Sequence, residues 1–223
     1  MPFRVKIISP LEASEADLAR RQWRYSQQAG PDTRVVVENL RGGPAALNTS
    51  GDVLASAAAI YRQGQDTRPN DYHAILIDCV FDPAVEELRE ATGLPTFGPT
   101  RVTLPLIRLV SPNFSIIART ERQCELLAGT VTGYGFGNYL CSLRALGISY
   151  EEAKRPEIFN LVMLERLEEA VVSDGARAIM FGSTTMALTD DMQATARGAP
   201  LFMPGMVALR VIEQLWFDGL WPK

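Results

Sequence analysis

The sequence has few of the residues on which many catalytic and structural sites depend. Its 223 residues include one histidine, His73, and three cysteines, Cys79, Cys124 and Cys141, with no Cys-x-x-Cys pair. One histidine cannot complete a zinc triad, and scattered cysteines argue against a disulfide framework. We therefore expect no metal site and a reducing, cytoplasmic location. His73 precedes a predicted strand, away from the turns that bind ligands, and is expected to be structural.

No sign of charge dominates, and no long hydrophobic run is present. Lys and Arg number 22 against 26 Asp and Glu, and both signs are scattered along the chain. This excludes the basic stripe that nucleic acid needs, and no apolar run is long enough to span a bilayer. The N-terminal apolar run is too short for a signal peptide. With 47% hydrophobic residues, the chain can form one domain or two small lobes.

Short apolar runs alternate with helical patterns along the chain. This alternation predicts an α/β fold with parallel sheets covered on both faces, and ligands beyond the carboxyl ends of the strands. We expect strands at 5–8, 34–38, 73–78, 113–118, 178–181 and 199–203. We expect helices at 15–28, 50–62, 83–92, 102–110, 120–127, 156–173, 187–196 and 206–219, with 96–98 starting a loop.

Two stretches of the chain are similar in pattern. In residues 75–83 and 178–186 an apolar strand leads to a small residue that can carry chemistry, and then to a predicted helix. Gly98-Pro99-Thr100 and Pro204-Gly205-Met206 follow in similar order. Two related lobes are one interpretation. The other is that strand–helix units resemble one another by construction.

Cys79 is the strongest candidate for chemistry. It follows the 73–78 strand and precedes a predicted helix, in which Asp82 is the expected N-cap and Pro83 the first residue. Free N–H groups and the helix dipole at such a turn favour the thiolate, the reactive form. The alternative is a small buried hydrophobic residue, which we favour for Cys124 and Cys141.

Hydroxyl side chains follow other predicted strands. Ser183, Thr184 and Thr185 come after the 178–181 strand, where hydroxyls and amides suit a bound carboxylate, although on spacing alone helix capping is the favoured explanation. Ser9 follows the first strand, and Thr120 follows the 113–118 strand, again with an N-cap as the alternative. The glycine-rich segment 133–137 does not fit a dinucleotide fingerprint and is more typical of a lid-like loop.

Five segments, in order, resemble the aspartate/glutamate/hydantoin racemase superfamily. Cys79-Val-Phe-Asp-Pro-Ala resembles the family's Cys-Phe-x-Asp-Pro-Gly turn, and residues 174–186 resemble its Asp-Gly-Ala-Glu-Ala-Ile-x-Leu-Gly-Cys-Ala-Gly-Met segment. The other three are the opening strand with its turn at 7–10, Leu94-Pro-Thr-Phe-Gly-Pro, and the last strand and helix from Pro200. The resemblance covers nearly the whole chain and is thinnest at 129–155.

The resemblance implies two similar flavodoxin-like lobes with the active site between them. Lobe one would comprise 1–103 and 205–223 and contain Cys79; lobe two would comprise 104–204 and contain Ser183. It implies a cofactor-independent enzyme in which two cysteines move a proton next to a carbonyl or carboxylate. Here Ser183 stands where the family has its second cysteine. Substrate contacts carried over by position are Ser9, Val80, Thr120, Thr184 and Thr185.

A serine hydroxyl is a much poorer acid or base than a thiol, so a serine at position 183 in place of the second cysteine affects which reaction is possible. The resemblance then favours one-sided chemistry by Cys79, as acid, base or nucleophile, on a small carboxylate, amide or hydantoin-like substrate. Decarboxylation, cis-trans isomerisation and hydrolysis are within that range. A true racemase and a non-catalytic small-anion-binding protein are the alternatives. Trp216, Phe217 and Trp221 suit either a homo-oligomer interface or core packing.

Overall fold

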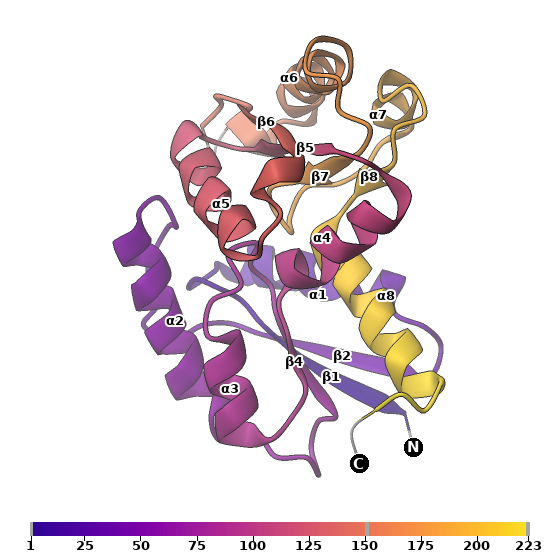
Figure 1. Cartoon of the computed structure of the whole chain (residues 1–223). Coiled ribbons are helices and arrows are strands. Elements are labelled where there is room, and N and C mark those ends of the chain that lie inside the picture. The colour runs from indigo at the N-terminus through magenta and orange to yellow at the C-terminus, as the bar shows by residue number, and fades with distance from the viewer. Residues whose placement is uncertain (1, 150–151, 222–223) are drawn as a thin grey trace. The chain divides into compact units, whose positions relative to one another are not determined.

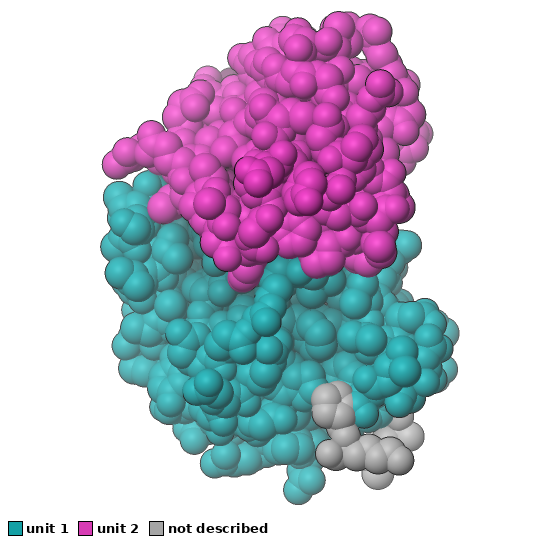
Figure 2. Space-filling view, in the orientation of Figure 1, with its two compact units in different colours: residues 1–102, 205–223 teal, residues 103–204 magenta. Residues whose placement is uncertain are grey.

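The computed structural model describes residues 2–149 and 152–221 and divides the chain into two compact units. Unit 1 comprises residues 1–102 and 205–223, and unit 2 comprises residues 103–204 (Figure 2). The chain passes from one unit to the other inside helix α4 (Pro99–Val110) and again inside helix α8 (Pro204–Phe217). Unit 2 is therefore an insertion between the first part of unit 1 and its last helix.

Unit 1 contains a four-stranded parallel sheet of order β2-β1-β3-β4 (Figure 1). The strands are β1 (Phe3–Ile8), β2 (Thr33–Glu38), β3 (Ala74–Ile77) and β4 (Thr96–Phe97), and the other helices are α1 (Glu15–Gln28), α2 (Ser50–Gly64) and α3 (Val85–Thr92). One face of the sheet packs in a core with residues of α2 and α3, among them Ile60 and Leu88. On the other face Phe3 stacks on Trp216 of α8, with ring centroids 4.7 Å apart.

Unit 2 repeats this arrangement with the strand order β6-β5-β7-β8. Its strands are β5 (Phe114–Ala118), β6 (Leu140–Ala145), β7 (Ile179–Phe181) and β8 (Leu201–Phe202). Its helices are α5 (Glu121–Gly133), α6 (Pro156–Glu168), the π-helix η3 (Glu169–Ser173), α7 (Asp190–Thr195), and the short η1 (Gly137–Tyr139) and η2 (Glu152–Lys154). The parallel α/β fold and its two related halves are confirmed.

Several predicted boundaries are wrong, for local reasons. Residues 96–98 do not simply start a loop, because Thr96 and Phe97 pair with β3. Strand β6 was not predicted, and its residues are mostly half-buried, so it lacks the apolar signal of a central strand. The helix predicted to run from 156 to 173 changes to π geometry at Glu169. The glycine-rich segment 133–137 joins α5 to β6 through η1.

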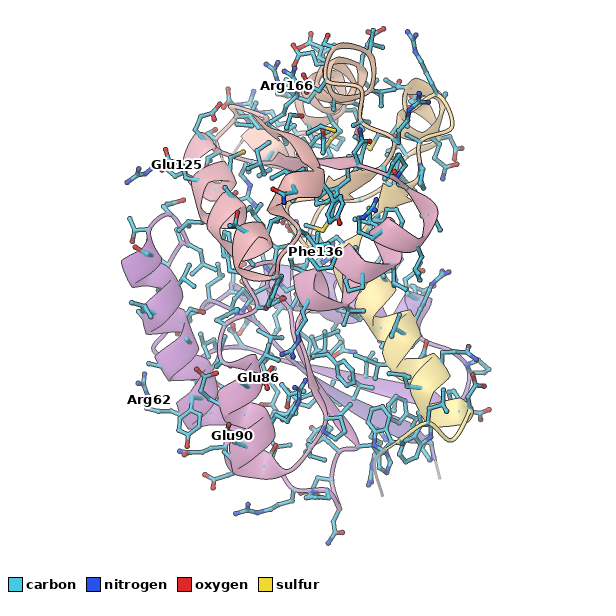
Figure 3. The ribbon with its side chains drawn as sticks, in the orientation of Figure 1. Arg62, Glu86, Glu90, Glu125, Phe136 and Arg166 are labelled. Carbon is cyan, nitrogen blue, oxygen red and sulfur yellow. The ribbon has the colours of Figure 1, made fainter. Side chains whose placement is uncertain are left out.

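Amphipathic patterning explains how the helices are oriented. In α3, Val85 and Leu88 are buried, whereas Glu86 and Glu90 are exposed (Figure 3).

The C-terminal aromatic residues pack mainly within unit 1. Trp216 contacts Phe3, and Trp221 lies 6.0 Å from Phe97 between ring centroids. Across 2–149 and 152–221, no helix is long and apolar enough to cross a membrane.

Candidate active site

Cys79 lies in a tight turn directly after β3. The N–H of Cys79 donates to the carbonyl of Ile77 over 2.8 Å, and the N–H of Asp82 donates to the carbonyl of Cys79 over 3.2 Å. The Cys79 side chain is buried in the core of unit 1 together with Ile77 and Val85. A hydrogen bond from the Phe81 N–H also reaches its sulfur. The thiol is therefore held by the turn and by the apolar residues around it.

Asp82 does not cap the helix that follows it, contrary to our prediction. Helix α3 begins only at Val85, and its N-cap is Ala84, with a positive φ of 60°. Asp82, with φ 49°, is buried and accepts hydrogen bonds from the N–H groups of Thr100 (3.1 Å) and Arg101 (2.7 Å). These amides belong to the first turn of α4, so Asp82 caps α4 from a distant part of the sequence.

Gly98 makes this long-range cap possible. It precedes Pro99, the first residue of α4, at the position where a helix usually carries its own capping side chain. A Cβ on Gly98 would lie 2.2 Å from Cγ of Asp82, so only glycine leaves space for the carboxylate. Thr100 adds a second link, because its hydroxyl donates to the carbonyl of Val80 over 2.6 Å. The Cys79 turn is thus joined to the start of α4 by three hydrogen bonds.

The Cys79 thiol is not shifted toward thiolate, which corrects a second prediction. Burial raises the pKa of Cys79, the carboxylates of Asp82 and Asp78 raise it further, and only the Phe81 N–H and the Arg21 guanidinium act to lower it. The expected stabilisation by a helix N-terminus is lacking because α3 starts beyond the turn. Cys79 therefore rests as a neutral thiol, a form suited to giving up a proton.

Two further predicted residues of unit 1 lie at the same edge of the sheet. Ser9 follows Ile8, which pairs with Ile77, so Ser9 lies beside Asp78 at the carboxyl ends of β1 and β3. Ser9 is fully buried, and its hydroxyl donates to the carbonyl of Leu11 over 2.9 Å. Val80 is buried in the Cys79 turn. Neighbouring strands thus bring Ser9, Cys79 and Val80 together.

In unit 2 the predicted residues gather in the same way. Ile117 of β5 pairs with Phe181 of β7, so Thr120 and Ser183 follow neighbouring strand ends. Gly182 permits the close approach of these ends, because a Cβ there would lie 2.8 Å from the Cβ of Ala118. The capping explanation holds for Thr120, whose side-chain oxygen accepts a hydrogen bond from the Gln123 N–H.

Ser183 and Thr185 form a small hydroxyl turn. Their side-chain oxygens lie 2.9 Å apart, and the N–H of Thr185 donates to Oγ of Ser183 over 3.2 Å. Thr184 between them is buried, whereas Thr185 is exposed. The helix expected from residue 187 begins only at Asp190 and is capped by Thr189, so the hydroxyls of this turn do not cap it. These hydroxyls can donate hydrogen bonds to an anionic group.

The two candidate residues occupy equivalent positions in the two units. Cys79 stands two residues after Ile77, the last residue of the third strand in its sheet order. Ser183 stands two residues after Phe181, the last residue of the third strand in the other sheet. The duplicated topology therefore places a thiol in unit 1 where unit 2 has a hydroxyl.

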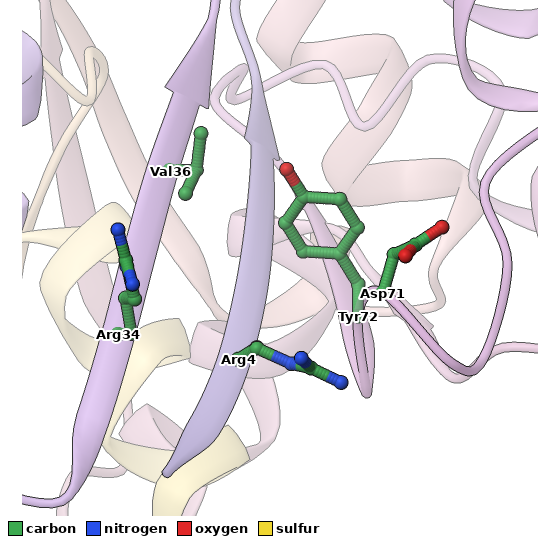
Figure 4. A pocket seen from close by; sticks show the side chains of 5 residues that line it. All are labelled: Arg4, Arg34, Val36, Asp71 and Tyr72. Carbon is green, nitrogen blue, oxygen red and sulfur yellow. The ribbon is translucent and has the colours of Figure 1, made fainter.

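A surface pocket of unit 1 is lined by none of the predicted site residues. A pocket of about 380 Å³ lies on the sheet of unit 1 near the start of β1 and β2, lined by Arg4, Arg34, Val36, Asp71 and Tyr72 (Figure 4). Cys79 is instead at the carboxyl ends of the strands. His73 is structural as expected: its Nδ1 accepts from the Arg4 N–H over 2.9 Å. Among the described residues no group of three or more His, Cys, Asp or Glu side chains is arranged to hold a metal ion.

Arg21 and Tyr25 were not predicted as site residues, although they contact the residue before Cys79. Tyr25 donates its hydroxyl proton to Oδ1 of Asp78 over 2.6 Å, and Arg21 forms an ion pair with Oδ2. Their four-residue spacing on α1 puts both on one helical face, but nothing in the sequence showed which strand end that face meets.

Comparison with known proteins decides the family. The family model described as Asp/Glu/Hydantoin racemase matches residues 5–212. The chain belongs to this family. It is 28% identical over 220 residues to a hydantoin racemase of Paenarthrobacter aurescens, covering 96% of this chain and 91% of that one. It is 24% identical over 188 residues to a hydantoin racemase of Rhizobium meliloti, covering 84% and 78%.

Solved structures of racemases share the fold. The crystal structure of allantoin racemase from Pseudomonas fluorescens superposes with a TM-score of 0.89 at 18% identity, covering 99% of this chain and 94% of that one. The membership confirms the resemblance drawn from the sequence and shows an enzyme of the racemase and isomerase type. The roles of Cys79, Ser183 and the substrate-contact residues stay predictions.

Proposed function

We propose that this enzyme transfers a proton at the carbon next to a carbonyl of a hydantoin-like cyclic amide or a related small carboxylate. Cys79 carries the proposal, because it stands at the carboxyl edge of the sheet, in the turn whose sequence resembles the family's Cys-Phe-x-Asp-Pro-Gly segment. The substrate class is supported by relatives named as hydantoin racemases and by a structural neighbour named as an allantoin racemase.

The neutral state of Cys79 supports a role as proton donor. The thiolate form of Cys79 takes the proton from the carbon next to the carbonyl and leaves an enolate, and the thiol so formed, whose pKa is raised by burial, readily gives a proton back to the same face of that enolate. After transfer, the thiolate is stabilised by the Phe81 N–H and by Arg21, the two groups that lower its pKa. Between the two transfers the thiol proton exchanges with solvent, so deuterium from heavy water enters the substrate from the side of Cys79.

The hydroxyl turn of unit 2 supplies binding rather than proton transfer. Ser183 and Thr185 donate hydrogen bonds to a carboxylate or to the oxygen of an enolate. A serine hydroxyl is a far weaker acid than a thiol, so Ser183 does not replace the family's second cysteine as acid or base. Thr120 contributes a further contact, whereas Ser9 is fully buried and its hydroxyl donates to the carbonyl of Leu11.

Exchange in heavy water tests the role of Cys79. Wild type, Cys79→Ser and Cys124→Ser are incubated with single enantiomers of 5-substituted hydantoins and of allantoin, and deuterium at the carbon next to the carbonyl is followed by NMR. We expect incorporation by wild type and by Cys124→Ser, a buried thiol of α5 that serves as the control. In Cys79→Ser the rate should fall about 10²–10⁴-fold, the usual contribution of general acid–base catalysis. Full exchange by Cys79→Ser would refute the proposal.

The same experiment tests Ser183. With one acid–base group, exchange proceeds with retention of configuration, and optical rotation decays more slowly than deuterium enters. Ser183→Cys supplies a second thiol and should bring loss of rotation closer to the rate of exchange. Equal rates of exchange and racemisation in wild type would instead show that a second group already acts, and that the chain is a true racemase.

A further inference from the structure

The residue before Cys79 is a fully engaged, buried carboxylate. Asp78 has 1% of its surface exposed, and both of its side-chain oxygens are bound from helix α1. Oδ1 accepts from the hydroxyl of Tyr25 over 2.6 Å, and Oδ2 pairs with the guanidinium of Arg21. Tyr25 is completely buried. The backbone N–H of Asp78 donates to the carbonyl of Ile8 over 2.9 Å, so this residue is anchored to both β1 and α1.

Asp78 and Cys79 are directed to opposite faces of the sheet. Successive residues at the end of a strand alternate between faces. Asp78 meets α1, whereas Cys79 packs with Ile60 of α2 and Leu88 of α3. The hold that α1 has on Asp78 therefore limits rotation of the strand end and keeps the sulfur on its own side.

Stability alone does not account for this buried pair. Taking two charges out of water costs about as much as their attraction returns, and apolar residues of similar volume often serve equally well or better. The ion pair of Arg21 with Asp78 is almost entirely removed from solvent, with side-chain exposures of 11% and 0%. Its placement beside the reactive thiol gives the charges a second effect, because a charge at short range in a buried site acts strongly on its neighbours.

The two charges act on the thiol in opposite directions. The carboxylate of Asp78 raises the pKa of Cys79, and the guanidinium of Arg21 lowers it. The other charged group acting on the sulfur is Asp82, within its own turn. Removing one partner of the pair therefore unbalances the field at Cys79, with a sign set by the partner that remains.

We infer that Arg21, Asp78 and Tyr25 are positioning residues for Cys79, which hold its turn in place and balance the charge beside its sulfur. This inference rests on the proposed function only where it concerns turnover. The neighbours that face the group are Asp17, which acts on Arg21, and Arg24, whose guanidinium lies 6.0 Å from the ring centroid of Tyr25.

The pH dependence of Cys79 alkylation tests the inference without any substrate. Iodoacetamide labelling is followed by mass spectrometry of the peptide containing Cys79, and the exposed Cys141 of β6 gives an internal reference rate. Because only thiolate reacts, the rate at neutral pH follows the thiol pKa, about tenfold for each pKa unit. We expect about tenfold faster labelling in Asp78→Asn and about tenfold slower labelling in Arg21→Met, relative to Cys141.

Three further variants separate charge from packing. Arg21→Lys keeps the positive charge and should restore the labelling rate to within about threefold of wild type. Arg62→Met removes an equal charge from the exposed face of α2 and should leave the rate unchanged. Tyr25→Phe keeps the charges and removes one hydrogen bond to Asp78. It should lower kcat in hydantoin exchange about tenfold with little change in KM.

Opposite shifts in Asp78→Asn and Arg21→Met support the inference, and shifts of the same sign, or none in both, overturn it. Circular dichroism checks that each variant folds. If one of the pair does not fold, the sign of the shift in the other decides. Opposite labelling shifts together with an active Cys79→Ser would refute the proposed function and leave the positioning intact. Labelling shifts of the same sign, or none, together with an inactive Cys79→Ser would refute the positioning role and leave the proposed function intact.

Discussion

Replacing Asp82 by alanine should loosen the start of helix α4 and the Cys79 turn together. The carboxylate accepts from the N–H of Thr100, which is buried, and from the N–H of Arg101, which is partly buried. A buried donor left without a partner costs about 1–3 kcal/mol, and the partly exposed amide recovers some hydrogen bonding from water. Loss of the charge at the helix N-terminus adds about 0.3–1 kcal/mol. The total is about 2–4 kcal/mol.

Amide hydrogen exchange measures this loss where it occurs. If α4 frays by about 2–4 kcal/mol, exchange at Thr100 and Arg101 should accelerate about 30- to 900-fold. Urea unfolding of the same variant should show a loss of similar size in the unit that contains the turn. Asp82→Asn keeps one oxygen as an acceptor, and we expect it to lose less than Asp82→Ala.

Asp52 provides a matched control. Its carboxylate also accepts two backbone hydrogen bonds at a helix N-terminus, from Asn48 (3.0 Å) and Thr49 (2.8 Å), but these bonds are exposed to solvent, so water replaces the carboxylate readily. Asp52→Ala should therefore cost much less than Asp82→Ala. If the two substitutions cost the same, or if exchange at Thr100 is unchanged in Asp82→Ala, the argument from burial is wrong.

Three other outcomes follow from unit 2. Gly182→Ala places a Cβ 2.9 Å from the Cα of Ala118, and because backbone cannot move cheaply we expect a loss of about 1–3 kcal/mol in urea unfolding; unchanged stability would contradict this. Arg144→Lys keeps the charge but loses the two-pronged pairing with Asp174, at 2.6 and 2.7 Å, and should cost about 1 kcal/mol or less, measured in the same way. Arg144 also holds the pKa of Asp174 below its usual value. The stabilisation from that pair is complete above the ordinary carboxyl pKa of about 4 and is lost as the pH falls through the lower folded value. Arg144→Met should flatten the unfolding free energy against pH in that acid range, and an unchanged slope would argue against the pairing.

Much of the fold could be predicted because it depends on local pattern. Helix α1 was predicted at its observed bounds, 15–28, where Ser14 caps a clear amphipathic stretch. The central strands β1, β3, β5 and β7 are apolar enough to be recognised. The short β4 and the half-buried β6 carry little signal of their own and are strands chiefly because each pairs with a stronger neighbour.

The candidate site could be predicted in place but not in its chemistry. Strand ends in a parallel sheet meet at one edge, so Ser9, Cys79 and Ser183 could be located from the sequence. The partners that decide their behaviour are distant in the chain: Arg21 and Tyr25 bind Asp78 from 57 and 53 residues away. Asp82 reaches amides 18 and 19 residues further on, against the simpler local expectation of a cap for α3.

The insertion of unit 2 into unit 1 sets an order for folding during synthesis. Helix α8 completes unit 1, where Glu213 accepts from the N–H of Gly30 over 2.7 Å and Trp216 covers Phe3. The ribosome makes α8 after the whole of unit 2, residues 103–204. Unit 2 can therefore fold before unit 1 is complete. Until α8 is made, Phe3 of the nascent unit 1 remains uncovered and can be bound by chaperones.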